Sequence, residues 1–179
     1  SHTGITIPVK RSMFHARIND IDGTMHLRPA TMEDLKTVIT WIGDEAACRE
    51  WAGSVVRFPM TVRSLQTDIE YVEDNTYCCD QEGCLMGFGQ LIRKSESRLH
   101  MARVIVDPQE RHRGNGKHLV RELMDLAWQK GCCRISLNVY RQNRPALTLY
   151  TSMGFREVAE TPTPDLCHMI IRYGSPNNI

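Results

Sequence analysis

The stretch VDPQERHRGNGKHLVREL, residues 106–123, carries the strongest indication of fold and chemistry in this sequence. It contains two glycines two positions apart, Gly114 and Gly116, within a cluster of basic residues. An apolar run ends where the stretch begins, and apolar residues recur at helical spacing over residues 114–130. A strand, a glycine loop and a helix start favour phosphate binding, because main-chain N–H groups and the positive end of the helix can face one anion.

Two familiar phosphate-binding patterns do not fit this loop. The Walker pattern requires glycine where Arg111 stands and serine or threonine where His118 stands. The dinucleotide fingerprint requires a third glycine where Leu119 stands. A cradle of main-chain amides over residues 111–117, surrounded by mobile positive charge, is the remaining phosphate-binding interpretation. A glycine turn with a solvated basic rim is the alternative that the loop by itself leaves open.

Length and composition predict one soluble globular domain. The chain has 179 residues, of which 41% are apolar and 24% are charged. Its formal net charge of +1 does not favour a nucleic-acid partner, and no apolar run approaches the roughly 18 residues of a membrane span. The seven cysteines form no CxxC pair and the histidines lack zinc-ligand spacing. We therefore expect free thiols in a cytoplasmic protein, with no membrane partner and no metal site.

Hydrophobic periodicity predicts helices and strands that alternate along the chain. Thr31 is typical of a helix N-cap, with Asp34 placed for a near capping box, and Thr61 is typical of the start of a second helix. We expect residues 43–59 to be rich in loops. The predicted strands are 24–30, 76–80, 84–94, 98–107, 133–140, 155–158 and 167–173, and the remaining helices are 114–130 and 144–154. The fold class is therefore α/β (α+β), a mixed sheet with helices packed on it.

Two motifs in this chain resemble those of the GNAT superfamily of acyl-CoA-dependent N-acyltransferases. VIVDPQERHRGNGKHLVREL, residues 104–123, matches the family's [QR]xxGx[GA] motif. NRPALTLYTSMGF, residues 143–155, resembles its second signature, NxxAxxLYxxxGF. Both the order and the spacing agree. The resemblance implies a mostly antiparallel twisted sheet of about six or seven strands with about four helices, splayed at the acyl-CoA site.

The resemblance extends over residues 25–173, which we expect to form the catalytic domain. Residues 1–24 would be an N-terminal extension, partly tag-derived or poorly ordered, and residues 174–179 a C-terminal tail. The implied co-substrate is acetyl-CoA. Loop amides would hold its pyrophosphate, the free backbone of the preceding strand would pair with its pantetheine arm, and Asn143 would bond the arm or its water. The implied binding residues are Val104, Ile105, Val106, Arg111, His112, Arg113, Gly114, Asn115, Gly116, Lys117, Asn143 and Tyr150.

The resemblance also implies that Tyr150 is the general acid, which protonates the departing CoA thiolate. A core tyrosine on an amphipathic helix is the alternative reading of its position. Many family members place a glutamate on the strand before the loop as part of the route for the amine proton, and this chain has no acid there. His100 is the nearest candidate general base. Glu70 and His168 are further candidates.

The acceptor amine would bind between the first helices and the late strands. Trp41 and Trp51 could cover it, and Glu50 could attract its positive charge; core tryptophans and a solvated acidic rim are the alternative. The implied function is N-acetyl transfer from acetyl-CoA to a primary amine, on a small molecule, a protein N-terminus or a lysine, by direct attack in a ternary complex. A non-catalytic acyl-CoA-binding or sensing domain is the alternative function. Either a monomer or a homodimer is compatible with the sequence.

Overall fold

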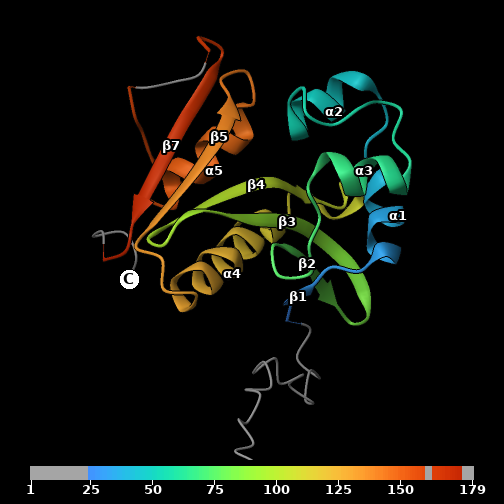
Figure 1. Cartoon of the computed structure of the whole chain (residues 1–179), viewed down its shortest axis with the longest axis horizontal. Coiled ribbons are helices and arrows are strands. Elements are labelled where there is room, and N and C mark those ends of the chain that lie inside the picture. The colour runs from blue at the N-terminus through green and yellow to red at the C-terminus, as the bar shows by residue number, and fades with distance from the viewer. Residues whose placement is uncertain (1–23, 160–162, 175–179) are drawn as a thin grey trace, which may run out of the picture.

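The computed structural model describes residues 24–159 and 163–174. Its elements form one mixed α/β unit (Figure 1). In chain order they are β1 (His26–Pro29), α1 (Met32–Thr40), α2 (Glu45–Ala52), α3 (Val62–Asp68), β2 (Thr76–Gln81), β3 (Cys84–Ser95), β4 (Arg98–Val106), the short 3₁₀ turn η1 (Pro108–Glu110), α4 (Asn115–Gln129), β5 (Arg134–Tyr140), α5 (Arg144–Ser152), β6 (Arg156–Glu157) and β7 (Leu166–Arg172). The expected extension, residues 1–24, and the tail, residues 174–179, lie almost entirely outside the described residues.

The seven strands form one sheet in the order β1-β2-β3-β4-β5-β7-β6. Every neighbouring pair is antiparallel except β4 and β5, which are parallel. These two strands pair only where Arg98–His100 lies beside Arg134–Ser136, and then they diverge (Figure 1). The mixed, mostly antiparallel sheet and its splay are confirmed. The splay leaves one edge of β4 free where the chain approaches the glycine loop.

Helices cover the two faces of the sheet unequally. The apolar faces of α4 and α5 meet β3, β4, β5 and β7 in the larger core, whereas α1, α2 and α3 cover the opposite face of the N-terminal half (Figure 1). The α4 helix lies very close to β3, since a Cβ atom on Gly89 would be 2.7 Å from Leu123 Cδ1. Glycine at this position therefore sets how closely the helix that follows the loop packs on the sheet.

The helix starts predicted at threonines are confirmed. Thr31 and Thr61 cap α1 and α3, and each forms a reciprocal capping box, Thr31 with Asp34. The expected loop over 43–59 is wrong in its first half, because α2 occupies it. Asp44 accepts a hydrogen bond from Ala47 N at 2.7 Å, and Gly53 ends the helix with a positive φ of 67°. An aspartate N-cap and a glycine stop were the sequence signals of this helix.

Candidate active site

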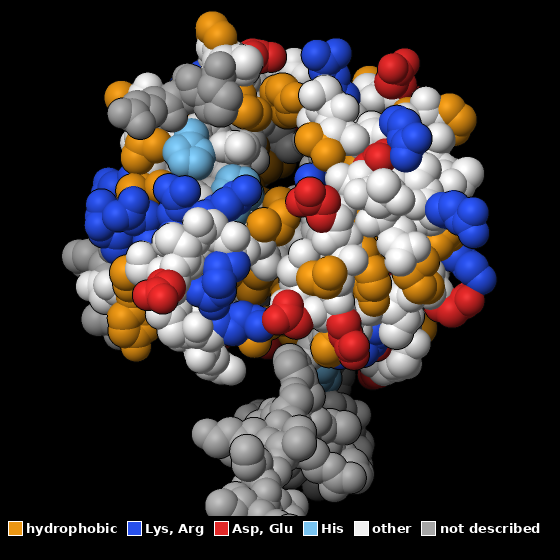
Figure 2. All heavy atoms as spheres, in the orientation of Figure 1, with side chains coloured by type: hydrophobic (Ala, Val, Ile, Leu, Met, Phe, Trp, Pro, Cys, Tyr) orange, Lys and Arg blue, Asp and Glu red, His pale blue; other side chains and the backbone are white. Residues whose placement is uncertain are grey.

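The divergence of β4 and β5 opens a cleft of about 620 Å³ between the two halves of the molecule. Figure 2 shows the surface hollowed along this line, between the β5–β7 half and the half that carries α2. Its walls come from β4, β5, the glycine loop, α5, and the α1–α2 region. The lining residues are Trp41, Ile42, Ala47, Glu50, Trp51, Met101, Arg103, Val104, Ile105, Val106, Arg111, His112, Gly116, Leu137, Asn138, Val139, Gln142, Asn143, Pro145, Ala146, Leu149 and Tyr150.

One wall is a bare strand edge. Ile105 and Val106 pair with β3 on one side, and in the described part of the chain no strand pairs with them on the other. Arg103, with φ of 53°, interrupts the ladder, and its carbonyl accepts a hydrogen bond from Trp51 Nε1 at 2.9 Å. The indole thus ties α2 to the irregular point of β4. An extended ligand can add to such an edge through main-chain hydrogen bonds.

The glycine loop ends the cleft and presents free amides. Gly114 is the N-cap of α4 in the left-handed conformation, φ 82°, and forms no side-chain cap. None of the described residues accepts a hydrogen bond from the main-chain N–H groups of residues 111–117; the first bonded amide is His118 N, which donates to Gly114 O at 3.1 Å. Unpaired amides at a helix N-terminus attract an anion. The loop therefore fits a phosphate group.

The loop residues divide into those that reach the cleft and those that shape the turn. Arg111, His112 and Gly116 line the cleft. Arg113 forms an ion pair with Glu110 at 3.0 Å, and the Asn115 side chain donates to Glu110 O at 2.8 Å. The remaining members of the predicted set, Gly114 and Lys117, belong to the helix start and do not line the cleft.

Asn143 and Tyr150 lie on α5 and both line the cleft. Asn143 caps the helix, since its Oδ1 accepts from Ala146 N at 3.2 Å, which leaves the side-chain NH₂ group available to a ligand. Tyr150 is 9% exposed, and burial raises the pKa of its hydroxyl to about 12. Its ring meets Phe155 edge to face at 5.7 Å. The phenol is therefore fully protonated at neutral pH and held rigidly.

His100 lies on β4 where β4 and β5 still pair, outside the lining of the cleft. Its Nδ1 is 2.8 Å from Ser136 Oγ, and its ring stacks on His168 with centroids 6.3 Å apart. Burial, together with nearby positive charge from Lys94 first, lowers the pKa of His100 to about 4. Glu70 and His168 are also absent from the lining. The structure does not bring these candidate bases to the cleft.

The residues predicted to bind the acceptor amine do meet at the cleft. Trp41, Trp51 and Glu50 all line it, and Glu50 is the only carboxylate among the described residues that do so. Sequence reasoning missed Asn138 and Gln142, which line the opposite wall from β5 and the turn after it. The polar position of Asn138 in the alternating strand was the available signal. It indicated an exposed face, but not that this face bordered a cleft.

Cysteine thiols, metal-binding groups and membrane-spanning helices were each sought in the described residues. All seven cysteines are free thiols, and none lines the cleft. No group of three or more His, Cys, Asp or Glu side chains that could hold a metal occurs in residues 24–159 and 163–174. Over the same residues, every helix is too short or too polar to span a bilayer.

The sequence model of the acetyltransferase (GNAT) family matches residues 44–155, which include the glycine loop, the splayed strands and α5. The chain belongs to this acetyltransferase family. Among the relatives of this chain, a thialysine N-epsilon-acetyltransferase of Sus scrofa is 29% identical over 62 residues, 35% of this chain and 36% of that protein. A glucosamine 6-phosphate N-acetyltransferase of Trypanosoma brucei brucei is 35% identical over 57 residues, 32% of this chain and 37% of that protein. These matches span about a third of each relative's length.

Solved structures of N-acetyltransferases share the whole fold. The PaiA N-acetyltransferase from Thermoplasma acidophilum, in complex with coenzyme A, has a TM-score of 0.67 at 21% identity and is covered over 99% of its chain, by 84% of this one. The spermidine N-acetyltransferase from Vibrio cholerae, with CoA and spermine, has a TM-score of 0.68 at 19% identity, over 95% of its chain and 83% of this one. At these identities the likeness establishes the fold.

Proposed function

We propose that this protein transfers the acetyl group of acetyl-CoA to a primary amine by direct attack in a ternary complex. The observation that carries the proposal is the cleft itself, which joins a free strand edge, an amide cradle at a helix N-terminus and a buried phenol. Membership of the acetyltransferase family and the CoA complexes of the structural neighbours support it. Acetyl-CoA would supply the activated thioester.

The three features suit three parts of acetyl-CoA. The amides of residues 111–117 would hold the pyrophosphate, with Arg111 and Lys117 adding positive charge. The free edge of β4 at Ile105 and Val106 would pair with the amide groups of the pantetheine arm, as an added strand does. The side-chain NH₂ of Asn143 would bond the same arm from the opposite wall. The binding set predicted from the sequence is therefore retained as part of this proposal.

In the reaction the amine nitrogen attacks the thioester carbonyl, the C–S bond breaks, and an acetamide forms. The departing sulfur takes a proton from the Tyr150 hydroxyl, the only phenol among the described residues that line the cleft. With a pKa of about 12, this hydroxyl keeps its proton until negative charge develops on the sulfur. The tyrosine recovers a proton from solvent when the products leave.

The amine must lose one proton before attack and a second afterwards. Glu50 is placed to attract the ammonium form, and water in the open cleft can take the protons. His100 remains a prediction as the general base. Because its pKa is about 4, His100 is neutral at pH 7 and could accept a proton only weakly. If it were the base, activity would fall as pH decreased through about 4, and His100→Gln would remove that limb of the pH–rate profile.

Two measurements test the proposal. Acetyl-CoA at about 100 times its dissociation constant should stabilise the fold by about 2.7 kcal/mol, which raises the melting temperature by several degrees. A panel of amines, including polyamines, aminoglycosides, lysine and peptides, should then release free thiol from acetyl-CoA in the presence of the protein. Stabilisation without thiol release from any amine would support the non-catalytic acyl-CoA-binding alternative. Absence of both responses would contradict the proposal.

A further inference from the structure

Within residues 24–159 and 163–174, no helix covers one face of the C-terminal half of the sheet (Figure 1). The opposite face of β5 and β7 packs into the larger core against α4 and α5. On the uncovered face three arginines stand in register on adjacent strands. Arg98 of β4 lies beside Arg134 of β5, which in turn pairs with Arg172 of β7. Like charges directly opposite one another in a sheet are destabilising, so this row has a cost in the isolated protein.

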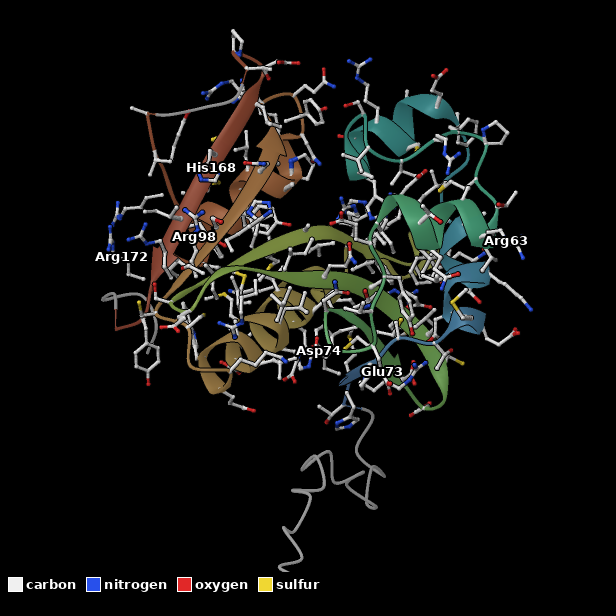
Figure 3. The ribbon with its side chains drawn as sticks, in the orientation of Figure 1. Arg63, Glu73, Asp74, Arg98, His168 and Arg172 are labelled. Carbon is white, nitrogen blue, oxygen red and sulfur yellow. The ribbon has the colours of Figure 1, made fainter. Side chains whose placement is uncertain are left out.

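Further basic residues extend the row into a continuous surface, which we call the basic face. Figure 2 shows Lys and Arg gathered there beside two histidines, and Figure 3 shows Arg98, His168 and Arg172 together on the half formed by β5 and β7. The basic face consists of Lys94, Arg98, His100, Arg134, Arg156, His168 and Arg172. Arg98, Arg134 and Arg156 form no ion pair with any described residue.

The two histidines of the basic face are uncharged at neutral pH, so Lys94 and the arginines carry its positive charge. Burial, and then the charge of Lys94, lower the pKa of His100 to about 4. Burial, and then the charge of Arg98, lower the pKa of His168. Arg98 also has a buried Nε with no hydrogen-bond partner. A guanidinium with an unmet donor, in register with two further arginines, suits a bound anion.

The basic face continues into the cleft. Asn138 of β5 lines the cleft, and its Oδ1 is 2.6 Å from His168 Nδ1. Asn138 and Arg134 lie on the same face of β5, four residues apart, which corresponds to about 13 Å along the strand. A small amine in the cleft cannot reach the arginine row. An extended polypeptide with its amine in the cleft would bring the side chains about four residues away onto it.

Two other occupants fit less well. A second copy that used this face symmetrically would place arginines against arginines. A nucleic acid usually requires a strongly basic protein and often aromatic side chains on which bases stack. The net charge is +1, and the seven residues of the basic face include no Phe, Tyr or Trp.

We propose that the acceptor is a polypeptide, and that the basic face binds an acidic segment centred about four residues from the amine that enters the cleft. This inference rests on the proposed function and names the substrate class for the same site. Glu50 and the basic face would then recognise opposite charges on one acceptor, the ammonium group in the cleft and the carboxylates beyond it.

Synthetic ten-residue peptides test the position of the acidic segment. One carries three aspartates at positions 4–6, one carries them at positions 8–10, and one has asparagines at positions 4–6. The kcat/KM for thiol release should be about tenfold higher for the first peptide than for the other two in low salt. The advantage should shrink in 0.5 M NaCl, because the charges are exposed to solvent. Equal values for all three peptides would overturn the inference.

Variants assign the preference to the basic face. Arg98→Gln/Arg134→Gln should bring the ratio between the first and third peptides to about one. Because Arg98 is half-buried, its replacement also perturbs packing. Arg172 is exposed, so Arg172→Gln provides a second variant, which should reduce the ratio. The matched control is Arg63→Gln/Arg121→Gln, which removes the same charge from exposed positions on α3 and α4. If the control lowers the ratio as much as the first variant, net charge rather than the basic face is responsible.

The outcomes separate this inference from the proposed function. Small amines that release thiol while no peptide does so would overturn the inference and leave acetyl transfer intact. If no acceptor releases thiol, acetyl transfer fails, and fluorescence anisotropy of the labelled first peptide with the CoA-saturated protein decides the inference. Salt-sensitive binding that Arg98→Gln/Arg134→Gln abolishes would uphold the basic face as a docking surface for acidic segments. Binding of a single-stranded oligonucleotide in preference to the peptide would overturn it in favour of a nucleic-acid surface.

Discussion

Gly114 and Gly131 lie at the two ends of α4. Substitutions at these two positions can therefore distinguish the loss of the amide cradle from the effect of backbone strain. Both have left-handed backbones, with φ of 82° and 81°, and a Cβ atom on either would meet no atom within 4 Å. Valine at each position therefore introduces the same strain, about 2 kcal/mol, without a steric clash inside the protein. We expect each variant to lower the melting temperature by about 4–8 °C.

Only the change at Gly114 should weaken the binding of acetyl-CoA. Relaxation of that residue from its left-handed conformation would turn the amides at the start of α4 away from the anion, and its side chain would project where the phosphate binds. Loss of even one hydrogen bond to a charged group costs about 1.5–3 kcal/mol, which corresponds to a tenfold or greater rise in Kd.

Isothermal titration calorimetry of both variants with acetyl-CoA measures the difference. Gly131→Val is the control for strain and should retain the affinity of the unmodified protein. Equal affinities in the two variants, with equal loss of stability, would refute the assignment of residues 111–117 as the phosphate cradle.

Three further predictions concern catalysis, packing and pH. Tyr150→Phe should lower kcat by about a hundredfold while the Kd for acetyl-CoA stays the same; an unchanged kcat would show that water supplies the proton. Gly89→Ala should cost about 1–3 kcal/mol in urea unfolding, because its Cβ would be 2.7 Å from Leu123 Cδ1; no loss would mean that the Leu123 side chain or α4 moves aside at little cost. Asp34 is desolvated, but its hydrogen bonds from Arg28 (2.7 and 2.9 Å) and Thr31 outweigh this and lower the pKa of its carboxyl. Its contribution to stability is therefore complete above the ordinary value of 3.8 and is lost as pH falls through the lowered pKa. Asp34→Asn should therefore make the free energy of unfolding less dependent on pH between about pH 5 and pH 2.

Much of the geometry of the candidate site could be predicted because its parts depend on local sequence. The glycine loop needs a left-handed residue at Gly114 and a helix immediately after it, and both requirements are visible in the order of residues. Asn143 caps α5 and Tyr150 follows two turns later on the same helix, so their spacing places both on the cleft side. The helix α2 was missed because it is only eight residues long, and its apolar residues serve the cleft as well as the core.

The sequence by itself determined the order of the strands and of every helix except α2, the glycine loop, and the family to which the two motifs belong. These depend on contacts within a few residues, where helix periodicity, caps and left-handed glycines act. The tertiary structure alone decided that β4 and β5 part after three paired residues, that Trp51 Nε1 donates a hydrogen bond to Arg103 O across 52 positions of the chain, and that His100 lies outside the lining of the cleft. It also set three arginines, far apart in the chain, side by side on one face. Strand pairing makes such neighbours, and its register emerges only when the whole sheet packs against its helices.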